Sequence, residues 1–539
     1  MTSRRESNNI LVRHASKCQS HSLRRCPIHE IHETFLLFVV CVSIFTSSLF
    51  SQTSNNKRFI RHETSVPGQY LVALANRNPS AIEGQARSIA ASYGGTLLDV
   101  YQTAFGGFLV ELTEAAAERL SEDPRVRWVE EDAVGTTKST VSAVRSTTIT
   151  PPSGPKYLWH LDRLDELYPA NGGTQLDGTY SSCTGKDVVA YVMDTGIWKD
   201  HQEFSGRAIY GVNFSLGGAF DSCSASDFSH GTAVASLLGG NQNGVANGVN
   251  LVSLRTNACN GVSWASRQIA ALNWIVNKSG YEQPEDFRNL PLNPYVGSNA
   301  VLNWSGFFAE GIGGYERVGH PDDPPSYVSD SVEVAVADVV NSGVVVVTSA
   351  DNYATDACGF APNHLSFTYN TSQAGLNTND GYTHSSVVVA PSVISVGGTS
   401  WINGQDHRWQ EMPGVSNFEG AGSNSGRCID LWAPAADIVI PSNKSTNEFY
   451  VNSGGTSWSA AIVSGMVARR LEFYGPPNAF TARNVFNDLK NYSTLLDAGG
   501  GPLVKDTSTP DGHAPDNVIG MVHLPPPTSC GRTRPASIQ

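Results

Sequence analysis

Three polar residues in widely separated segments carry side chains that suit nucleophilic chemistry. Asp194 follows an apolar run in VMDTGI, His230 lies in SHGTAVASLLGG, and Ser457 follows a pair of glycines in SGGTSWSAAIVSG. A serine hydroxyl is a poor nucleophile near neutral pH, so a histidine has to accept its proton. A carboxylate has to hold that imidazole in the right tautomer. These residue types together predict acyl transfer through an activated serine.

The segments around these residues predict elements that bring them together. The apolar run 187–193 predicts a buried strand, and Asp194 follows at its carboxyl end, where open α/β sheets carry their sites. Helical patterns begin at His230 and just before Ser457. Further apolar strands are expected at 251–255, 300–304, 344–350 and 393–399, and helices at 230–238, 263–276, 329–341 and 456–474. This alternation favours an α/β fold with a mostly parallel sheet.

Each motif taken alone is a weak signal. DTG also occurs in aspartic proteases, but that chemistry needs a second DTG or DSG segment, which this sequence lacks. An isolated HGT is common. The three motifs in the order Asp, His, Ser, with these flanking residues, are far more specific than any one of them.

A smaller domain is expected before the α/β region, at residues 68–134. Strands are predicted at 69–75, 96–102, 106–112 and 126–132, with helices at 79–93 and 113–120. The order βαββαβ is that of a ferredoxin-like split βαβ unit. The following residues, 135–156, are rich in Ser, Thr and Pro and lack apolar periodicity, which predicts an exposed linker open to cleavage.

These features carry a family resemblance. The run from GQYLV through AFGGFLVEL to PRVRWVEEDAV resembles the inhibitor-type propeptide that precedes subtilisin-like proteases. The order Asp, His, Ser is the one that subtilisin uses. The segment YLWHLDRLDELYPANGGTQLDGTYSS resembles the start of a mature enzyme of the proteinase K and aqualysin group. The resemblance covers roughly residues 68–134 and 157–475, and it implies a subtilisin-like, doubly wound and mostly parallel sheet in a peptidase domain, 157–500.

The resemblance also implies roles for single residues. Asp194, His230 and Ser457 match the catalytic triad. Asn352, after the VVVVTSA strand, matches the amide donor of the oxyanion hole, whose second donor is the backbone N–H of Ser457. Residues 260–263 resemble the edge strand that pairs with an extended substrate. The residues implied in substrate binding are Gly261, Ser263, Ser305, Gly306, Ala350 and Asp351.

Several positions depart from the family pattern. Asp351 stands where the family has glycine, and Phe307 and Phe308 follow Ser305-Gly306 where the family reads Ser-Leu-Gly-Gly. Three outcomes stay open: a remodelled pocket, a carboxylate that favours Lys or Arg before the cut bond, or low activity. Trp458-Ser459 replaces Met-Ala after the serine. The alternative function is therefore a catalytically weak or inactive relative that binds peptides or proteins.

Cysteines and oxygen ligands give further expectations. Six cysteines remain beyond the leader, with no CxxC or zinc spacing, so disulfides are expected in place of a metal cluster. The resemblance implies the pairs Cys223–Cys259 and Cys358–Cys428, and leaves over Cys183 and Cys530. It also implies a structural Ca²⁺ held by the carboxylate of Asp430 and the backbone carbonyls of Pro391 and Val393. The alternative for Asp430 is a turn cap. No catalytic cofactor is expected.

Composition and the first residues indicate export. Among the 539 residues only 16% are charged, and the net charge of −13 argues against nucleic acid as a partner. Within the leader, 1–60, residues 35–50 carry no charge; a cleaved secretory signal is favoured over a signal anchor in the membrane. Residues 501–539 form a Pro-rich tail. We expect a secreted, extracellular serine endopeptidase, made as a zymogen and inhibited by its own propeptide, that cuts proteins or peptides as a monomer. Sequons are compatible with glycosylation at Asn213, Asn277, Asn303, Asn370, Asn443 and Asn491.

Overall fold

A computed structural model gives the fold of most of the two predicted domains. It describes residues 59–62, 64–136, 144–149, 158–164, 183–214, 223, 229–277, 296–297, 299–305, 329–352, 393–402, 405–410, 422–424, 429–474, 485, 488–489, 493–495 and 519–522. All of them belong to one compact unit that begins at Arg58. The predicted leader lies outside this set except for its last two residues. Among the described helices, none combines the length and apolar character that a membrane crossing requires.

The first domain has the predicted βαββαβ order. Its elements are β2 (Ser65–Leu74), α3 (Pro79–Ser92), β3 (Thr96–Tyr101), β4 (Gly107–Glu111), α4 (Glu114–Ser121) and β5 (Val126–Thr136). The strands run in the order β5-β2-β4-β3, antiparallel throughout, and the short β1 (Phe59–Ile60) adds to β5 in parallel. Helix α3 begins where Asn78 accepts the N–H of Ser80 and proline occupies the first turn. The prediction of a ferredoxin-like α+β domain is confirmed.

A mostly parallel sheet forms the centre of the second domain. Its strands run in the order β18-β19-β15-β13-β12-β11-β7-β9-β8, and β14 pairs with β13. Among the strand pairs that the structure describes in this sheet, only β13–β14 and β18–β19 are antiparallel. The strand bounds are β7 (Val189–Asp194), β8 (Ala208–Asn213), β9 (Asn250–Arg255), β11 (Ala300–Trp304), β12 (Val345–Ser349), β13 (Val393–Ile402), β14 (Gln405–Arg408), β15 (Leu431–Pro434), β18 (Ser493–Leu495) and β19 (Ile519–Val522).

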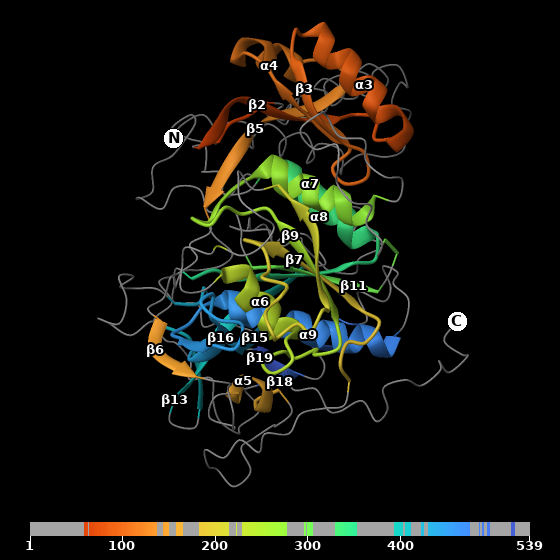
Figure 1. Ribbon diagram of the computed structural model, residues 1–539. Helices are drawn as coiled ribbons and strands as arrows, with labels where there is room; N and C mark the ends of the chain where they lie inside the picture. The colour runs from red at the N-terminus through yellow and green to blue at the C-terminus, as the bar shows by residue number, and fades with distance from the viewer. Residues whose placement is uncertain are drawn as a thin grey trace, which may run out of the picture. The chain divides into compact units, whose positions relative to one another are not determined.

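Helices cover both faces of this sheet (Figure 1). Helices α7 (Ala265–Val276) and α8 (Asp330–Asn341) lie together on one face, and α6 (His230–Gly239) and α9 (Thr456–Tyr474) lie on the other. Strand β7 shows why both faces are apolar. Its side chains alternate, with Ala190 and Val192 in the α6–α9 core and Tyr191 and Met193 in the α7–α8 core. Such continuous apolar strands are typical of parallel sheets that are buried on both sides.

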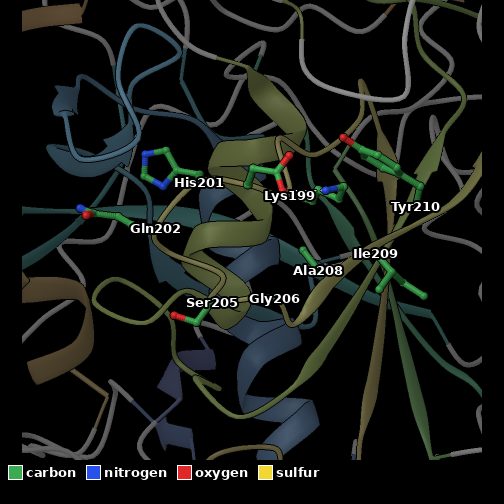
Figure 2. Close-up of a pocket in the computed structure, with 9 residues that line it drawn as sticks. Lys199, His201, Gln202, Ser205, Gly206, Ala208, Ile209 and Tyr210 are labelled. Carbon is green, nitrogen blue, oxygen red and sulfur yellow. Dashed lines mark hydrogen bonds and ion pairs between the residues drawn. The ribbon is translucent and has the colours of Figure 1, made fainter.

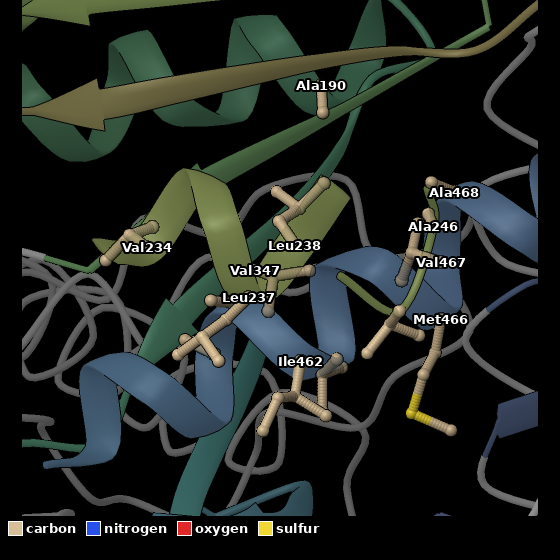
Figure 3. Packing of buried hydrophobic residues seen from close by; sticks show 14 of the residues in the cluster. Ala190, Val234, Leu237, Leu238, Ala246, Val347, Ile462, Met466, Val467 and Ala468 are labelled. Atoms are coloured by element: carbon tan, nitrogen blue, oxygen red, sulfur yellow. The ribbon is translucent and has the colours of Figure 1, made fainter. Parts of the chain in front are cut away.

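The contact between α6 and α9 holds the helix that begins at His230 (Figure 3). Leu237 and Leu238 pack against Ile462 and Val467, and all four side chains are completely buried. Burying one such side chain contributes about 1.5–3 kcal/mol. The two helices come close at Gly465 of α9, where an added Cβ would lie 2.8 Å from the backbone carbonyl oxygen of Leu238 in α6. The two helices whose first residues carry chemistry therefore share one tightly packed core.

Part of the predicted linker differs from the expectation. Residues 144–149 form β6 (Val144–Ile149), which pairs antiparallel with β17 (Phe449–Asn452), and β17 in turn pairs with β16 (Ile438–Pro441). The composition of VRSTTI supplies the reason, because valine, threonine and isoleucine favour strands even without a clear alternation. Helix α7 also starts two residues later than predicted, since Val262–Trp264 form the short strand β10.

One predicted sequon is incompatible with glycosylation of the folded chain. Asn303 lies inside β11, is fully buried, and donates through Nδ2 to Ser464 Oγ at 2.9 Å. A glycan on this amide would require the strand to leave the sheet. Burial in the parallel sheet, which the three-residue motif does not encode, excludes this position.

Candidate active site

Asp194 and His230 form a hydrogen-bonded pair. Asp194 is the last residue of β7 and is 1% exposed, while His230 is the first residue of α6. The imidazole Nδ1 lies 2.9 Å from Oδ1 and 2.8 Å from Oδ2 of Asp194. Because an ionised carboxylate only accepts, this contact puts the proton on Nδ1 and leaves Nε2 as the acceptor.

The backbone beside this pair requires a glycine. The N–H of Gly231 donates to Thr195 Oγ1 at 3.0 Å, and an added Cβ at Gly231 would lie 2.4 Å from the carbonyl oxygen of Gly196. The N–H of Thr195 donates in turn to Asp194 Oδ1 at 2.6 Å. The HGT and DTG motifs are thus joined by hydrogen bonds and close backbone packing, which hold the start of α6 against the end of β7.

Ser457 lies at the start of α9, on the same side of the sheet as His230. It is the second residue of the helix and is 6% exposed. Its Oγ donates to the carbonyl oxygen of Ser305 at 3.1 Å, and the next residue, Trp458, packs its ring against His230 with centroids 5.2 Å apart. Among the described contacts, the hydroxyl of Ser457 is bonded to Ser305 and not to His230. The structure therefore places the three predicted residues around the starts of α6 and α9, with the hydroxyl of Ser457 turned toward Ser305.

Asn352 adjoins the same helix start. Its Oδ1 accepts both the N–H and the Oγ1–H of Thr456, each at 2.9 Å, and the residue is 7% exposed. These two bonds decide which end of the amide is the oxygen, so Nδ2 remains as the donor end. The first N–H groups of α9, including that of Ser457, have no partner within the helix. Donors of this kind beside a serine hydroxyl suit a developing oxyanion.

Of the other residues implied in substrate binding, some lie inside and some outside the described part of the chain. Ala350 is buried, and Asp351 adopts a φ of 86° and is 8% exposed. The carboxylate of Asp351 accepts the N–H of Asn352 at 2.5 Å. Glycine is the usual residue at such a positive φ, which agrees with the glycine expected from the resemblance. Gly306 and its neighbours Phe307 and Phe308 lie outside the described residues.

The edge strand is occupied by the chain's own first domain. Strand β10 pairs antiparallel with the end of β5, in the register Val262–Thr136, Ser263–Gly135 and Trp264–Val134. Gly261 precedes it with a φ of 84°, and Ser263 Oγ donates to the carbonyl of Thr256 at 3.0 Å. Residues 260–263 are expected to pair with an extended substrate, and in this structure 262–264 pair with the chain's own β5.

Two buried carboxylates of β5 bind the starts of α7 and α8. Asp132 accepts the N–H of Ser266 at 2.8 Å and its Oγ–H at 2.7 Å, and Glu130 accepts the corresponding groups of Ser331 at 2.9 and 2.5 Å. Both carboxylates are completely buried. Helix N-termini favour such anionic caps, because their first N–H groups are unsatisfied and the helix dipole is positive there.

The pKa values of the two carboxylates shift in opposite directions. Burial is the largest influence on Asp132 and raises its pKa to about 6, although the bonds from Ser266 oppose the shift. Burial also disfavours the charge of Glu130. There, however, the hydrogen bond and charge of His62, with the hydroxyl of Ser331, outweigh burial and lower the pKa of Glu130. The ring nitrogen Nε2 of His62 lies 2.8 Å from Glu130 Oε1.

A loop of the first domain adds a third group of contacts. Asn273 Oδ1 accepts the N–H groups of Thr103 and Ala104 at 2.9 and 3.1 Å. Asp338 accepts the N–H of Phe105 at 2.9 Å and also pairs with Arg77. The first domain is therefore tied to α7 and α8 at both ends of the two helices.

One predicted disulfide lies within the described residues. Cys223 and Cys259 are bonded, with Cα atoms 5.3 Å apart. Cys183 is also in a disulfide, and its partner lies outside the described part of the chain, as do Cys358 and Cys428. The pair Cys223–Cys259 joins the segment before α6 to the segment before β10.

The expected calcium ligands are described only in part. Asp430 Oδ2 accepts the N–H of Ser395 at 2.9 Å, beside the start of β13, where Val393 lies. Pro391 lies outside the described residues. Carboxylate and carbonyl oxygens suit a hard cation, so the donors that are described fit Ca²⁺ in type. Within the described residues no group of three His, Cys, Asp or Glu side chains could hold a metal ion.

An open cavity of about 690 Å³ lies between the turn after β7 and the start of β8. Figure 2 shows the residues that line it, among them Lys199, His201 and Tyr210. Burial lowers the pKa of His201 to about 4, so this imidazole is neutral near pH 7. Neither Asp194, His230 nor Ser457 lines this cavity, and its side chains supply no nucleophile paired with a base.

Three contacts near the site are absent from the sequence predictions. They are the two carboxylate caps, from Glu130 and Asp132, and the packing of Trp458 on His230. A signal existed for the caps. Glu130 and Asp132 are two residues apart and therefore share one face of their strand. Nothing in the local pattern at Trp458 reports its tertiary neighbour.

Comparison with known proteins agrees with both domains. Residues 185–498 match the Subtilase family, and residues 67–138 match the Peptidase inhibitor I9 family. An extracellular serine proteinase from Thermus sp. (strain Rt41A) is 30% identical over 421 residues, which cover 77% of this chain and 78% of that protein.

One solved structure supports the same fold. Fervidolysin from Fervidobacterium pennivorans, a keratinolytic enzyme related to subtilisin, matches with a TM-score of 0.51 and 17% identity, over 86% of this chain and 62% of that one. A cold-adapted subtilisin-like serine proteinase is 26% identical, with a TM-score of 0.43, over 64% of this chain and 94% of that one. The Subtilase match spans more than half of the sequence. The chain therefore belongs to the subtilase family of serine endopeptidases and carries an inhibitor I9 domain before its peptidase domain.

Proposed function

We propose that this chain is a secreted endopeptidase in which Ser457 is the nucleophile and His230 the general base. The observation that carries the proposal is the double contact of His230 Nδ1 with Asp194, which leaves Nε2 to accept a proton. Ser457 Oγ attacks the carbonyl carbon of the scissile bond while its proton passes to Nε2. The tetrahedral intermediate collapses, the imidazolium gives that proton to the leaving amine, and an ester to Ser457 remains. Water, deprotonated by the same nitrogen, then attacks the ester carbonyl, and the imidazolium returns its proton to Ser457 Oγ as the acid is released.

Asn352 supplies the oxyanion donor in this proposal. Its Oδ1 is committed to Thr456, so its Nδ2 donates, together with the N–H of Ser457, to the oxygen that becomes negative. Asp194 holds the imidazole in its tautomer and stabilises the imidazolium without taking the proton. All of these groups belong to the chain, so the reaction needs no cofactor.

The first domain is the inhibitor of this zymogen. Its last strand, β5, pairs with the edge strand β10, where an extended substrate would pair. We place the activating cut in the linker 135–156, between β5 and β6, because β6 already pairs with the peptidase strand β17. Cleavage there leaves β6 with the mature enzyme and frees the inhibitor domain to leave.

The remaining parts of the proposal concern the setting in which the enzyme works. The extracellular location of the Thermus relative supports secretion of this chain. Its substrates would be extended segments of proteins or peptides. We propose a monomer, stabilised by the Cys223–Cys259 disulfide and by a structural Ca²⁺ at Asp430, Val393 and Pro391. The ion would hold these segments in place and take no part in the reaction.

The test uses the full-length precursor, expressed where no other protease cuts it. Ser457→Ala should abolish peptide hydrolysis and leave the precursor uncut. Ser459→Ala is the matched control, because Ser459 lies in the same helix turn and donates only to the carbonyl oxygens of Ala433 and Pro434. Complete processing of the Ser457→Ala precursor would contradict autocatalytic maturation, and retained hydrolysis would contradict the nucleophile.

A further inference from the structure

Trp458 lies directly against His230. It is the third residue of α9 and is 2% exposed. The centroid of its ring is 5.2 Å from that of the imidazole, and the two planes are inclined by 34°. This geometry is a tilted stack, so the imidazole presents a face to the indole and not only an edge. The same helix turn that carries Ser457 therefore also supports the proposed base.

The indole is held in this orientation by polar contacts. Its Nε1 donates to Asn452 Oδ1 at 3.1 Å, and the same oxygen accepts the N–H of Gly454 at 3.0 Å. Asn452 is completely buried at the end of β17. A Cβ added at Gly455 would lie 3.2 Å from the indole Nε1, tighter than an ordinary contact. The tryptophan is thus positioned by the sheet beneath it and cannot easily follow a displaced histidine.

We propose that Trp458 is a positioning residue for His230 that also stabilises its charged form. This inference rests on the proposed function of His230 as the general base. The hydrogen bond from Nδ1 to Asp194 and the packing of Trp458 against the ring face together hold the imidazole in one orientation, so Nε2 points in a fixed direction. The face of an indole attracts a cation. An imidazolium formed as Ser457 loses its proton is therefore stabilised more than the neutral ring is.

Other charged groups around His230 stay constant when residue 458 changes. The elements that pack against α6 are α9, β16, β7 and β9. Strand β7 contributes Asp194, and β9 contributes the buried Arg255, which lies opposite Asp194 in the strand register. Strand β16 contributes no charged residue. The first turns of α6 and α9 carry no acidic residue, and the charged residues of α9 begin at Arg469, about three turns away. A difference between variants at position 458 thus reports the indole itself.

The first experiment measures kcat and KM against pH for the processed enzyme and for Trp458→Phe and Trp458→Met. Methionine is the residue expected here from the resemblance and has no π-face. We expect the acidic limb of the kcat/KM profile to move down by about half a pH unit in Trp458→Met, the shift given by an ordinary cation–π interaction, and by less in Trp458→Phe. We expect kcat to fall about three- to tenfold, because the imidazolium is formed in the transition state, and KM to change little.

Trp409 provides the matched control for losing a buried indole. It is 1% exposed and packs beside Gly454, where an added Cβ would lie 2.0 Å from its Nε1. Trp409→Phe should lower the melting temperature without moving the acidic limb. If Trp409→Phe moves that limb as far as Trp458→Phe does, the shift is a general effect of loosened packing and the inference is wrong.

A second readout separates this inference from the proposed function. NMR follows the titration of the His230 ring in the Ser457→Ala precursor, with His230→Ala to assign the signal. The titration midpoint should fall in Trp458→Met by the same half unit, whether or not the enzyme hydrolyses any peptide. An unchanged midpoint there and in Trp458→Phe would overturn the role of Trp458 while leaving the triad intact. Activity retained by Ser457→Ala would instead overturn the proposed function.

Discussion

Ser457 and Ser305 bind each other in both directions. The Oγ of Ser457 donates to the carbonyl oxygen of Ser305 at 3.1 Å, and the Oγ of Ser305 donates to the carbonyl oxygen of Ser457, also at 3.1 Å. The end of β11 is thereby tied to the first turn of α9. In the proposed mechanism, the hydroxyl of Ser457 has to rotate about the Cα–Cβ bond before Nε2 of His230 can accept its proton. Such misaligned catalytic hydrogen bonds are common when no substrate is bound.

The first prediction concerns the amide of Asn352. Asn352→Asp keeps an oxygen that can accept from Thr456 but replaces the donor with a carboxylate. We expect kcat to fall by at least about 10²–10³, the loss found for such a donor in subtilisin, with KM changed little. Steady-state kinetics on a peptide amide measures both constants.

Asn352→Leu distinguishes the donor from the bonds that hold it. This variant loses the donor and also the two contacts with Thr456. It should be as slow as Asn352→Asp and less stable than it. An Asn352→Leu enzyme that keeps wild-type kcat would show that the oxyanion is stabilised elsewhere.

The second prediction concerns the residue before Asn352. Asp351 carries a buried carboxylate where the family resemblance leads one to expect glycine. A substrate guanidinium or ammonium would form a charge-assisted hydrogen bond with that carboxylate. We expect Asp351→Gly, and equally Asp351→Asn, to lower the preference for Lys or Arg over Leu before the cut bond by about tenfold, the value of one charge-assisted bond. A peptide-library profile that favours apolar residues there, unchanged in Asp351→Gly, would remove this role.

The third prediction concerns pH and the inhibitor domain. The pKa of Asp132 is raised to about 6 in the docked protein, against an ordinary value of 3.8. A group with a raised pKa contributes stability below its ordinary pKa and loses it as the pH rises through the folded value. In the Ser457→Ala precursor, this carboxyl should cost about 1–3 kcal/mol of unfolding free energy between about pH 4 and pH 7. Urea titrations of Asp132→Asn, which stays neutral, should lack that slope.

Glu130 gives a control of opposite sign. Its pKa is lowered, so its contribution is present at neutral pH and is lost as the pH falls below its ordinary value of 4.5. The wild-type precursor should lose stability at acid pH through Glu130 and at neutral pH through Asp132. Glu130→Gln should abolish the first loss, and Asp132→Asn should abolish the second. Equal slopes in the two variants would mean that neither carboxyl controls docking.

Sequence reasoning reached most of the fold because the strands are long apolar runs. Helix α9 was predicted with its observed bounds, Thr456–Tyr474, and β11 with its bounds, Ala300–Trp304. Strands β15–β17 were not predicted, because four-residue strands carry too little periodicity. Strand β6 reads as linker because it lies in a segment rich in Ser, Thr and Pro, and because its pairing with β17 depends on residues about 300 positions later.

The sequence predicts which residues form the candidate site but not how their side chains are oriented. The flanks of Asp194, His230 and Ser457 are distinctive enough to name them from the sequence. The orientation of the Asn352 amide depends on Thr456, and the turn of the Ser457 hydroxyl depends on Ser305, a residue 152 positions away. These are tertiary contacts between segments distant in the chain, and no local pattern encodes them.

The fourth prediction concerns the disulfide between Cys223 and Cys259. It spans 36 positions in the sequence, and a loop of that size gives about 4 kcal/mol on the chain-entropy model. The double variant Cys223→Ser with Cys259→Ser should lose stability of that order in urea titrations of the processed enzyme. Since the bond ties the segments before α6 and β10, kcat/KM should also fall. A double variant with wild-type stability would assign the bond no structural role.

The central claim is that Ser457 is a nucleophile activated by His230. The most direct measurement is the reaction of the processed enzyme with an irreversible phosphonate probe, followed by mapping of the labelled residue by mass spectrometry. We expect one phosphonylated residue, Ser457, labelled rapidly in the wild type and at least about 10³ times more slowly in His230→Ala. Absence of labelling, or labelling of Ser457 at the same rate in His230→Ala, would contradict it and would favour an inactive relative that binds peptides.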